Sequence, residues 1–205
     1  GLPLMFNELM WAAGVTFTNQ CYSLRGLGVV AALNISSTII NVLNVVYMAL
    51  GVSISIVVGN LLGAGKLEEA KDTDRKMIAF SLMCSIGVGL ILVILAPIFP
   101  KMYNTTDEAR QIATYMIMIS SMIMPSHAFA NAAYFTLRSG GQVFITLLFD
   151  SVFMWVVVIP TAFILGNFTS ISIYWLYLVC QSLEILKAIF GAILVKRGTW
   201  VKTLV

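Results

Sequence analysis

Charged side chains are scarce in this 205-residue chain. They make up 10% of the residues, whereas hydrophobic residues make up 60%. A soluble domain carries roughly 25% charged residues. A globule of this size cannot hide so much apolar surface from water, so lipid is the expected solvent. The net charge of +3 is small and does not indicate nucleic acid as a partner. We expect an integral membrane protein.

Residues that usually carry metal or catalytic chemistry are also few. The chain has one histidine, His127, and three cysteines without CxxC spacing, Cys21, Cys84 and Cys180. All three cysteines lie in apolar runs, where packing is the expected role. The sequence has no HExxH, no GxSxG and no Cys/His pair at ligand spacing. We therefore expect neither an enzyme, a metal site nor a bound cofactor.

Long hydrophobic runs are abundant and predict the fold class. Six runs are long enough to cross about 30 Å of hydrocarbon at about 1.5 Å per residue. They cover roughly residues 3–22, 29–61, 77–99, 110–136, 143–165 and 171–195. We predict an all-α, polytopic transmembrane bundle in which residues 1–205 form one six-helix lobe. Because the chain opens on Gly-Leu-Pro without an initiator Met, we expect a piece of a longer protein.

The connectors predict how the chain sits in the membrane. Basic residues gather in the connectors after the second and fourth runs and after the sixth: Lys66, Lys71, Arg75, Lys76, Arg138, Lys196, Arg197 and Lys202. The opposite side carries Arg25, Lys101 and Arg110. The positive-inside rule then places residues 63–76 and both chain ends in the cytoplasm. We expect 63–76 to be an elbow with a short interfacial helix, and Thr106-Asp107-Glu108 to begin a helix.

The elbow contains Gly-Ala-Gly-Lys, which invites comparison with a phosphate-binding loop. The GxxxxGK[ST] pattern would need glycine at position 60 and Ser or Thr at position 67. The chain has Asn60 and Leu67 there. Nucleotide binding is therefore not expected.

An ionisable residue inside a membrane span is a functional candidate, because burying it in lipid is costly. Glu8 in the first run could bind Na⁺ or cycle a proton, or it could be hydrogen-bonded to a neighbouring helix or nearly interfacial. In the second run, Asn34, Asn41 and Asn44 share one helical face. Three amides on one stripe either bond between helices or line a wet cavity.

The fourth run repeats this pattern with His127 and Asn131 on one side and Pro125 in mid-span, where a kink would free a carbonyl. His127 could carry a proton or be satisfied by a neighbour. Asp150 and Glu184, in the last two runs, are structural or coupling acids. Glu184 and Lys187 are spaced for a salt bridge, and Asp150 could pair with Lys187 or Arg138.

Several stretches occur in an order that resembles the multidrug and toxic compound extrusion (MATE) transporters, specifically their second six-helix lobe. They are Gly1-Leu2-Pro3 before Glu8, the span that opens with Val30-Ala31-Ala32 and runs through Gly51 into Val58–Ala70 with Gly-Asn-x-x-Gly-Ala-Gly, Leu137–Gly141, the span with Asp150, Trp155 and Pro160, and Lys196–Trp200. The elbow is the most specific stretch. The resemblance covers essentially the whole chain.

The resemblance implies a two-lobed antiporter of a prokaryotic plasma membrane that exports organic cations in exchange for H⁺ or Na⁺. It implies an N-terminal six-helix lobe as partner and a cation-site role for Glu8. Many relatives also have an acid in the fourth helix, where this chain has His127 and Asn131. We therefore expect H⁺ as the driver and the coupling acid in the other lobe.

Three rival functions remain at this stage. A lipid-linked oligosaccharide flippase of related architecture should show more basic residues on the cavity faces. An intramembrane hydrolase would need His127 within reach of Asp150 or Glu184 and a nucleophile, but we expect these groups at different depths. A scaffold has little use for costly buried amides.

Overall fold

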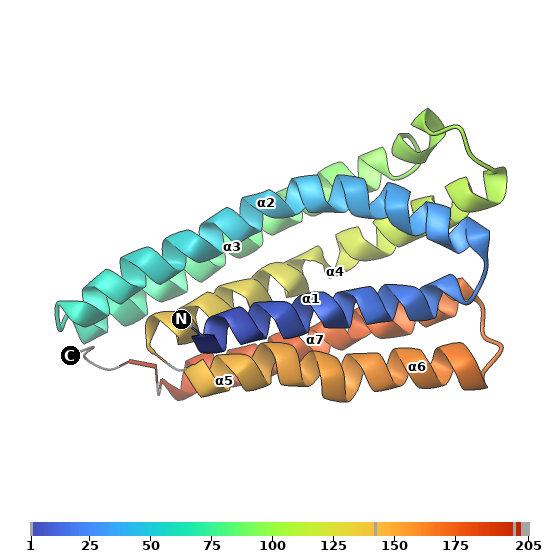
Figure 1. The fold of residues 1–205 in the computed structure, drawn as a ribbon. Coiled ribbons are helices and arrows are strands. Elements are labelled where there is room, and N and C mark those ends of the chain that lie inside the picture. Colours follow the sequence, from blue (N-terminus) through green and yellow to red (C-terminus); the bar gives the residue numbers. More distant parts are fainter. Residues whose placement is uncertain (1, 142, 199, 202–205) are drawn as a thin grey trace.

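A computed structural model describes residues 2–141, 143–198 and 200–201, and within them it contains helices and no strand. The long helices are α1 (Leu2–Ser23), α2 (Leu27–Gly63), α3 (Leu67–Leu95), α4 (Asp107–Ser139) and α7 (Ile173–Arg197). Another long helical stretch is built from α5 (Val143–Leu147), the π-helical η2 (Leu148–Val152) and η3 (Met154–Val158), and α6 (Ile159–Phe168). A short 3-10 helix, η1 (Phe99–Met102), precedes α4. The predicted all-α bundle is confirmed (Figure 1).

Among the described residues, five helices are long and apolar enough to cross a membrane: α2, α3, α4, the stretch Phe144–Phe168, and α7. The first predicted span, 3–22, coincides with α1, which has 22 residues but is not one of the five. Its polar residues include Asn7, Glu8, Asn19 and Gln20. Helix α1 is therefore long enough to cross a membrane but is not apolar enough by composition. Its polar groups depend on contacts with neighbouring helices.

The elbow differs from the expected one. No separate interfacial helix forms, because α3 begins at Leu67 and continues unbroken into the apolar span. Gly65 adopts φ 78, a left-handed conformation that glycine accepts without strain. The Lys66 amide donates to the Leu61 carbonyl at 3.0 Å and closes the turn. Glu68 and Glu69 then occupy the first turn of α3, where the helix dipole favours acids.

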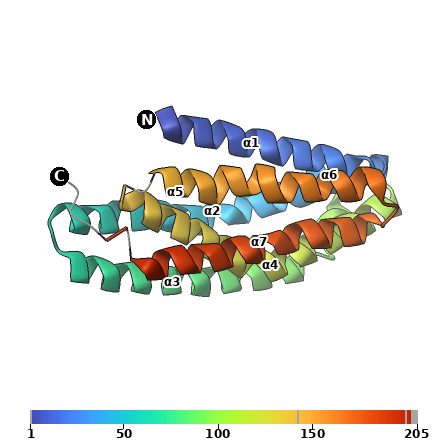
Figure 2. The ribbon, with the colours of Figure 1, turned by 90° about the horizontal axis from the view of Figure 1, so that it is seen from below.

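Helix α4 is the centre of the bundle, and α2, α3 and α7 pack against it. Helix α1 instead packs mainly on the α5–α6 stretch and lies at one edge of the bundle (Figure 2). From the turn at residues 24–26, α1 and α2 diverge towards the opposite end (Figure 1). Helices α1 and α2 carry the predicted binding residues Glu8, Asn34 and Asn41. These two helices therefore make little contact with each other.

The basic connectors gather at one end of the bundle. The elbow, the turn after α4 and the last turn of α7 lie together there (Figure 1). Lys202 and the two chain ends, residues 1 and 205, lie outside the described residues. At the other end, Arg25 donates to the carbonyls of Leu165, Gly166 and Thr169, so it caps the end of α6. The cytoplasmic placement of the basic end stays a prediction.

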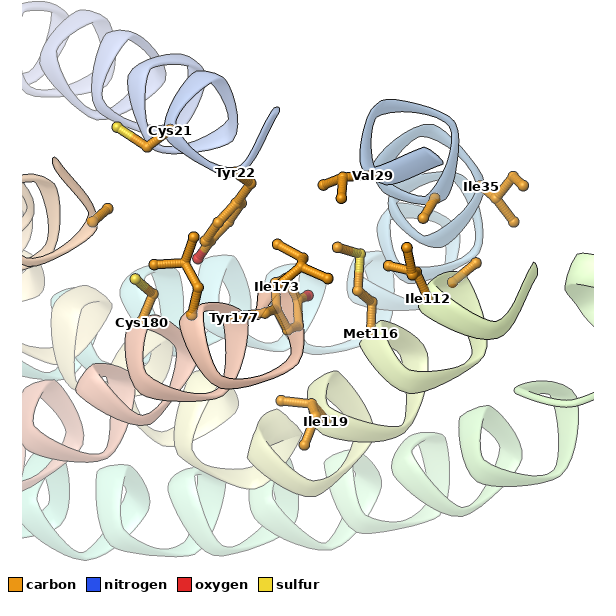
Figure 3. Close-up of a cluster of buried hydrophobic side chains, with 14 of the residues drawn as sticks. Cys21, Tyr22, Val29, Ile35, Ile112, Met116, Ile119, Ile173, Tyr177 and Cys180 are labelled. Atoms are coloured by element: carbon orange, nitrogen blue, oxygen red, sulfur yellow. The ribbon is translucent and has the colours of Figure 1, made fainter. Parts of the chain in front are cut away.

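A dry core fills the end that holds the α1–α2 turn (Figure 3). It joins Tyr22 of α1, Val29 of α2, Met116 of α4 and Tyr177 of α7. Only 5% of the surface of Tyr177 is exposed, and its hydroxyl is hydrogen-bonded to Ser120 at 2.9 Å. Trp200 is also buried. Trp175 is exposed, as an interfacial anchor should be.

Two predicted features of α4 can be followed in the structure. Thr106 caps the helix by accepting a hydrogen bond from the Ala109 amide at 3.2 Å, which confirms the predicted start. Pro125 lies inside a continuous helix, and its ring removes the bond that the Ser121 carbonyl would accept. That carbonyl oxygen lies 3.0 Å from where a Cβ of Gly89 on α3 would be. The lack of a side chain at Gly89 lets α3 approach the freed carbonyl.

Candidate functional site

An ion pair between Asp150 and Lys187 joins η2 to α7. Lys187 Nζ donates to Asp150 Oδ1 at 2.7 Å, and the two side chains are only 16% and 11% exposed for Asp150 and Lys187 respectively. This confirms one of the two partners expected for Asp150. The aliphatic stem and ammonium of Lys187 also lie beside Phe149, with Nζ 5.5 Å from the ring centroid. Each charge is thus compensated inside the bundle.

Asn7 of α1 organises the groups around this pair. It is 2% exposed and donates to Asp150 Oδ2 at 3.1 Å and to the Tyr134 hydroxyl at 3.3 Å. Ser151 donates to the Asn7 carbonyl at 3.0 Å and is also hydrogen-bonded to its amide oxygen. Four helical elements therefore meet at one buried polar network. The network supplies hydrogen-bond partners for the buried amide of Asn7, which apolar packing could not provide.

His127 of α4 lies beside Glu184 of α7. Nδ1 and Oε2 are 3.6 Å apart, and the side chains are 33% and 15% exposed. The expected Glu184–Lys187 salt bridge along α7 was wrong as the main pairing, because each residue instead takes a partner from a neighbouring helix. The expectation that His127 and Glu184 lie at different depths was also wrong. Their sequence positions do not reveal how α4 and α7 are staggered.

This arrangement gives little support to a hydrolase. A nucleophile would have to lie within hydrogen-bond reach of His127. The partner that the structure gives His127 is a carboxylate, Glu184. The hydroxyl of Ser151 on η2 is hydrogen-bonded to Asn7.

Asn131 takes the interhelical alternative. Its amide donates to the Tyr47 carbonyl of α2 at 3.2 Å. Gly51 lies beside it, where a Cβ would be 2.4 Å from Asn131 Nδ2 and 2.6 Å from the Phe135 ring. Asn131 thus acts first as a contact between α2 and α4, and it stays a candidate for the binding role only by proximity to His127 on the same face.

The amides of α2 divide into two groups. Asn34 and Asn41 are exposed, as is Glu8 on α1. Asn44 is half-buried, and its Oδ1 is buried without a hydrogen-bond partner in the described part of the chain. A buried acceptor without a partner costs free energy. Asn44 is therefore the amide of this stripe that can still accept a donor from a ligand or from water.

The residues that the sequence reading left out of the site are Asn7, Ser151 and, as a member, Lys187. Asn7 and Glu8 are adjacent, so they point about 100° apart on a helix. Both residues are polar side chains in an apolar run. Glu8 was chosen as the site residue because it is the charged one. The fold turns Asn7 inward and Glu8 outward. A lysine in an apolar run is itself a signal that a buried acid is near.

The candidate site contains two ion pairs that join neighbouring helices. Within the described ranges, no group of three or more His, Cys, Asp or Glu side chains is placed to hold a metal ion. The cysteines Cys21 and Cys180 are buried, Cys84 is half-buried, and all three are free. Two shallow depressions have volumes of about 210 and 130 Å³. Phe80 helps to line the first, and Trp155 and Ser151 help to line the second.

Comparison with known proteins connects this geometry to a family. Residues 3–164 match the family model described as MatE. The chain is similar to a probable multidrug resistance protein NorM of Oceanobacillus iheyensis, with 25% identity over 178 residues. That match covers 85% of this chain and 39% of the relative.

Two further relatives give the same picture. A probable multidrug resistance protein NorM of Halalkalibacterium halodurans is 24% identical over 87% of this chain and 40% of its own length. A multidrug resistance protein NorM of Aliivibrio fischeri is 24% identical over 80% of this chain and 35% of its own length. The chain thus spans about two fifths of the length of these curated relatives. With most of its length matched by the family model and its apolar helices bundled as a multi-pass membrane protein, the chain belongs to the MatE family.

Proposed function

We propose that this chain is the second, C-terminal six-helix lobe of a two-lobed antiporter that exports organic cations across a prokaryotic plasma membrane. The relatives named above as multidrug resistance proteins support the activity. Their greater length supports a missing lobe. In this proposal both chain ends are cytoplasmic, lipid surrounds the outer helices and the N-terminal lobe is the partner.

The observation that carries the proposal is the exposure of polar groups on α1 and α2. Glu8, Asn34 and Asn41 are uncovered in the lobe, although the same helices bury Asn7 and Ser36. A carboxylate and two amides facing hydrocarbon would be costly. Opposed by a second lobe, the same faces would line a water-filled cavity between two halves. A carboxylate and amides suit a cationic guest better than an anionic one.

The coupling ion is H⁺ or Na⁺ in this proposal, and we favour H⁺. Glu8 is the carboxylate nearest the proposed cavity, with Asn34, Asn41 and Asn44 as its amide wall. His127 is the proton carrier, with Asn131 holding α4 against α2. The acids Asp150 and Glu184 stand behind them, paired with Lys187 and His127.

The test is efflux of a fluorescent organic cation from vesicles that contain the complete two-lobe transporter. A pH gradient or a Na⁺ gradient is imposed, and the wild type is compared with Glu8→Gln. Glu69→Gln is the matched control, because Glu69 is exposed on the elbow and lies outside the proposed cavity. We expect efflux driven by the pH gradient, reduced at least tenfold by Glu8→Gln and unchanged by Glu69→Gln.

Other outcomes would change the assignment. Unchanged efflux in a folded Glu8→Gln variant would make Glu8 structural and transfer the search to the other lobe. No wild-type efflux under either gradient would contradict the export proposal and favour the flippase.

A further inference from the structure

The larger of the two shallow depressions, about 210 Å³, lies between α2 and α3 beside the elbow. Leu50 of α2 lines one side, and Thr73, Lys76, Met77 and Phe80 of α3 line the other. The α3 residues follow the spacing i, i+3, i+4, i+7, so they share one face of the helix. Pockets that enclose a drug-sized molecule are larger, about 300–1,000 Å³. The depression therefore fits one part of a longer molecule that continues beyond it.

The depression lies at the level where α3 passes from the polar elbow into its apolar span. Lys76 is charged, and the next charged residue along the chain is Lys101. Lys76 and Phe80 are both exposed, so an ammonium group stands at the rim and an aromatic ring lies one turn deeper. A lysine at this level keeps its charge among the lipid headgroups while its aliphatic stem lies along apolar surface. The depression is therefore shaped for an amphiphile, with its polar head at the rim.

The rim carries charges of both signs. Lys76 Nζ lies 2.9 Å from Asp72 Oδ2, and both side chains are largely exposed. Arg75 and Glu69, which are also exposed, add one further charge of each sign on the same stretch of α3. A purely anionic headgroup would be attracted by the bases and repelled by the acids. A headgroup that carries one charge of each sign can pair with Lys76 and Asp72 at the same time.

The depression is separate from the cavity proposed between the two lobes. Leu50 and Asn41 are nine residues apart on α2, which places them about 180° apart around the helix. Helices α1 and α3 also lie on opposite sides of the bundle (Figure 2). A second lobe that covers Glu8 and Asn41 would therefore leave the depression facing the membrane lipid.

We propose that the depression between α2 and α3 binds a zwitterionic phospholipid whose headgroup carries a phosphate and a primary ammonium, as in phosphatidylethanolamine. The phosphate accepts hydrogen bonds from Lys76 and from the Thr73 hydroxyl, and the ammonium donates to the Asp72 carboxylate. One acyl chain lies over Met77 and Phe80. The trimethylammonium of phosphatidylcholine has no N–H to donate, so Asp72 distinguishes the two lipids. The inference goes beyond the proposed function, because it does not depend on what is exported.

The test measures lipid binding to the complete transporter purified in detergent. The protein is supplied with equal amounts of phosphatidylethanolamine, phosphatidylcholine and phosphatidylglycerol, and native mass spectrometry measures how much of each lipid it retains. We expect phosphatidylethanolamine to be retained roughly fivefold more than either of the other two lipids, because each lacks one of the two polar contacts or meets the acids of the rim.

Two variants separate the contacts of the headgroup. Asp72→Asn should abolish the preference for phosphatidylethanolamine over phosphatidylcholine, because the acceptor for the ammonium is lost. Lys76→Gln should lower the retention of all three lipids, because each carries a phosphate. Lys71→Gln is the matched control and should behave as the wild type. Lys71 is also exposed and paired with an acid, Glu68, at 3.8 Å, but it does not line the depression.

Three results would overturn the inference. Equal retention of the three lipids by the wild type would mean that the rim does not select a headgroup. Preferential retention of phosphatidylglycerol would mean that the basic residues act as a general anionic-lipid surface. Equal losses in Lys71→Gln and Lys76→Gln would mean that the depression has no special part in binding. The efflux assay of the proposed function is a separate measurement, so either proposal can fail while the other stands.

Discussion

The buried charges between η2 and α7 each have a specified partner. Lys187 and Asp150 form a direct pair, and Asn7 supplies the second bond to the carboxylate. A buried pair gains little overall stability, because desolvation offsets much of the attraction. Removing one member is different, because the charge that remains has no compensation. The consequence is measurable at single residues.

We predict that Asp150→Asn and Lys187→Met each destabilise the complete transporter by about 3–5 kcal/mol. The double variant should be clearly more stable than either single variant, because it leaves no orphan charge. The measurement is the melting temperature in detergent, followed by intrinsic fluorescence. Additive losses in the double variant would show that the two charges do not act as a pair.

At this scale the sequence singled out candidate residues but did not reveal all of their partners. The cost of an ionisable group in an apolar run singled out Asp150, Glu184 and His127, and the structure places all three in interhelical ion pairs. Pairing failed for Glu184 and Lys187, because spacing along one helix is visible in a sequence but the stagger between α4 and α7 is not. Asn7 was passed over because a neutral amide next to an acid carries the weaker signal.

At the scale of elements, close helix contacts depend on positions without side chains. Gly51 of α2 faces Asn131 and Phe135 of α4, and a Cβ there would be 2.4 Å from the Asn131 amide nitrogen. Small residues at such positions let helices pack closely in a membrane, where no hydrophobic force drives them together. Gly59, two turns further along α2, meets nothing within 4 Å.

Gly51→Ala should therefore destabilise the protein by about 1–3 kcal/mol, because the added methyl pushes Asn131 away from the Tyr47 carbonyl. Gly59→Ala is the control and should be neutral or stabilising by up to about 1 kcal/mol, since alanine favours helix. Thermal unfolding in detergent compares the two variants. Equal effects would mean that α2 and α4 adjust freely at this contact.

Helix ends and lengths were well predicted where local chemistry determines them. Thr106 with the acids after it begins α4 as expected. The elbow was predicted less well. The change from polar to apolar residues between Lys76 and Met77 suggests the end of one helix and the start of another, but α3 is continuous there. No proline or strained glycine interrupts residues 67–95, so a single helix continues across that change.

For the whole molecule, the basic residues predict which end of the bundle faces the cytoplasm. The elbow and the end of α7 carry most of them and lie at the same end (Figure 1). The opposite end carries Arg25, which caps α6, and Lys101, which is exposed. The orientation can be tested without any transport assay.

We predict that Asn104→Cys is labelled by a membrane-impermeant maleimide on intact cells and that Glu68→Cys is labelled only after the cells are opened. Both positions are exposed in the structure. The background should lack the native cysteines Cys21, Cys84 and Cys180. The reverse labelling pattern would mean that the bundle has the opposite orientation in the membrane, with the elbow outside the cell.

The Asp150–Lys187 pair also constrains how the chain is made. Its members are 37 residues apart in the sequence and lie on successive apolar stretches. During synthesis Asp150 is therefore made before Lys187 and is unpaired until Lys187 follows. A span that contains an unpaired carboxylate enters lipid poorly. The two stretches should therefore enter the membrane together as a helical hairpin. Formation of the ion pair is then a condition for membrane insertion as well as a contact in the folded bundle.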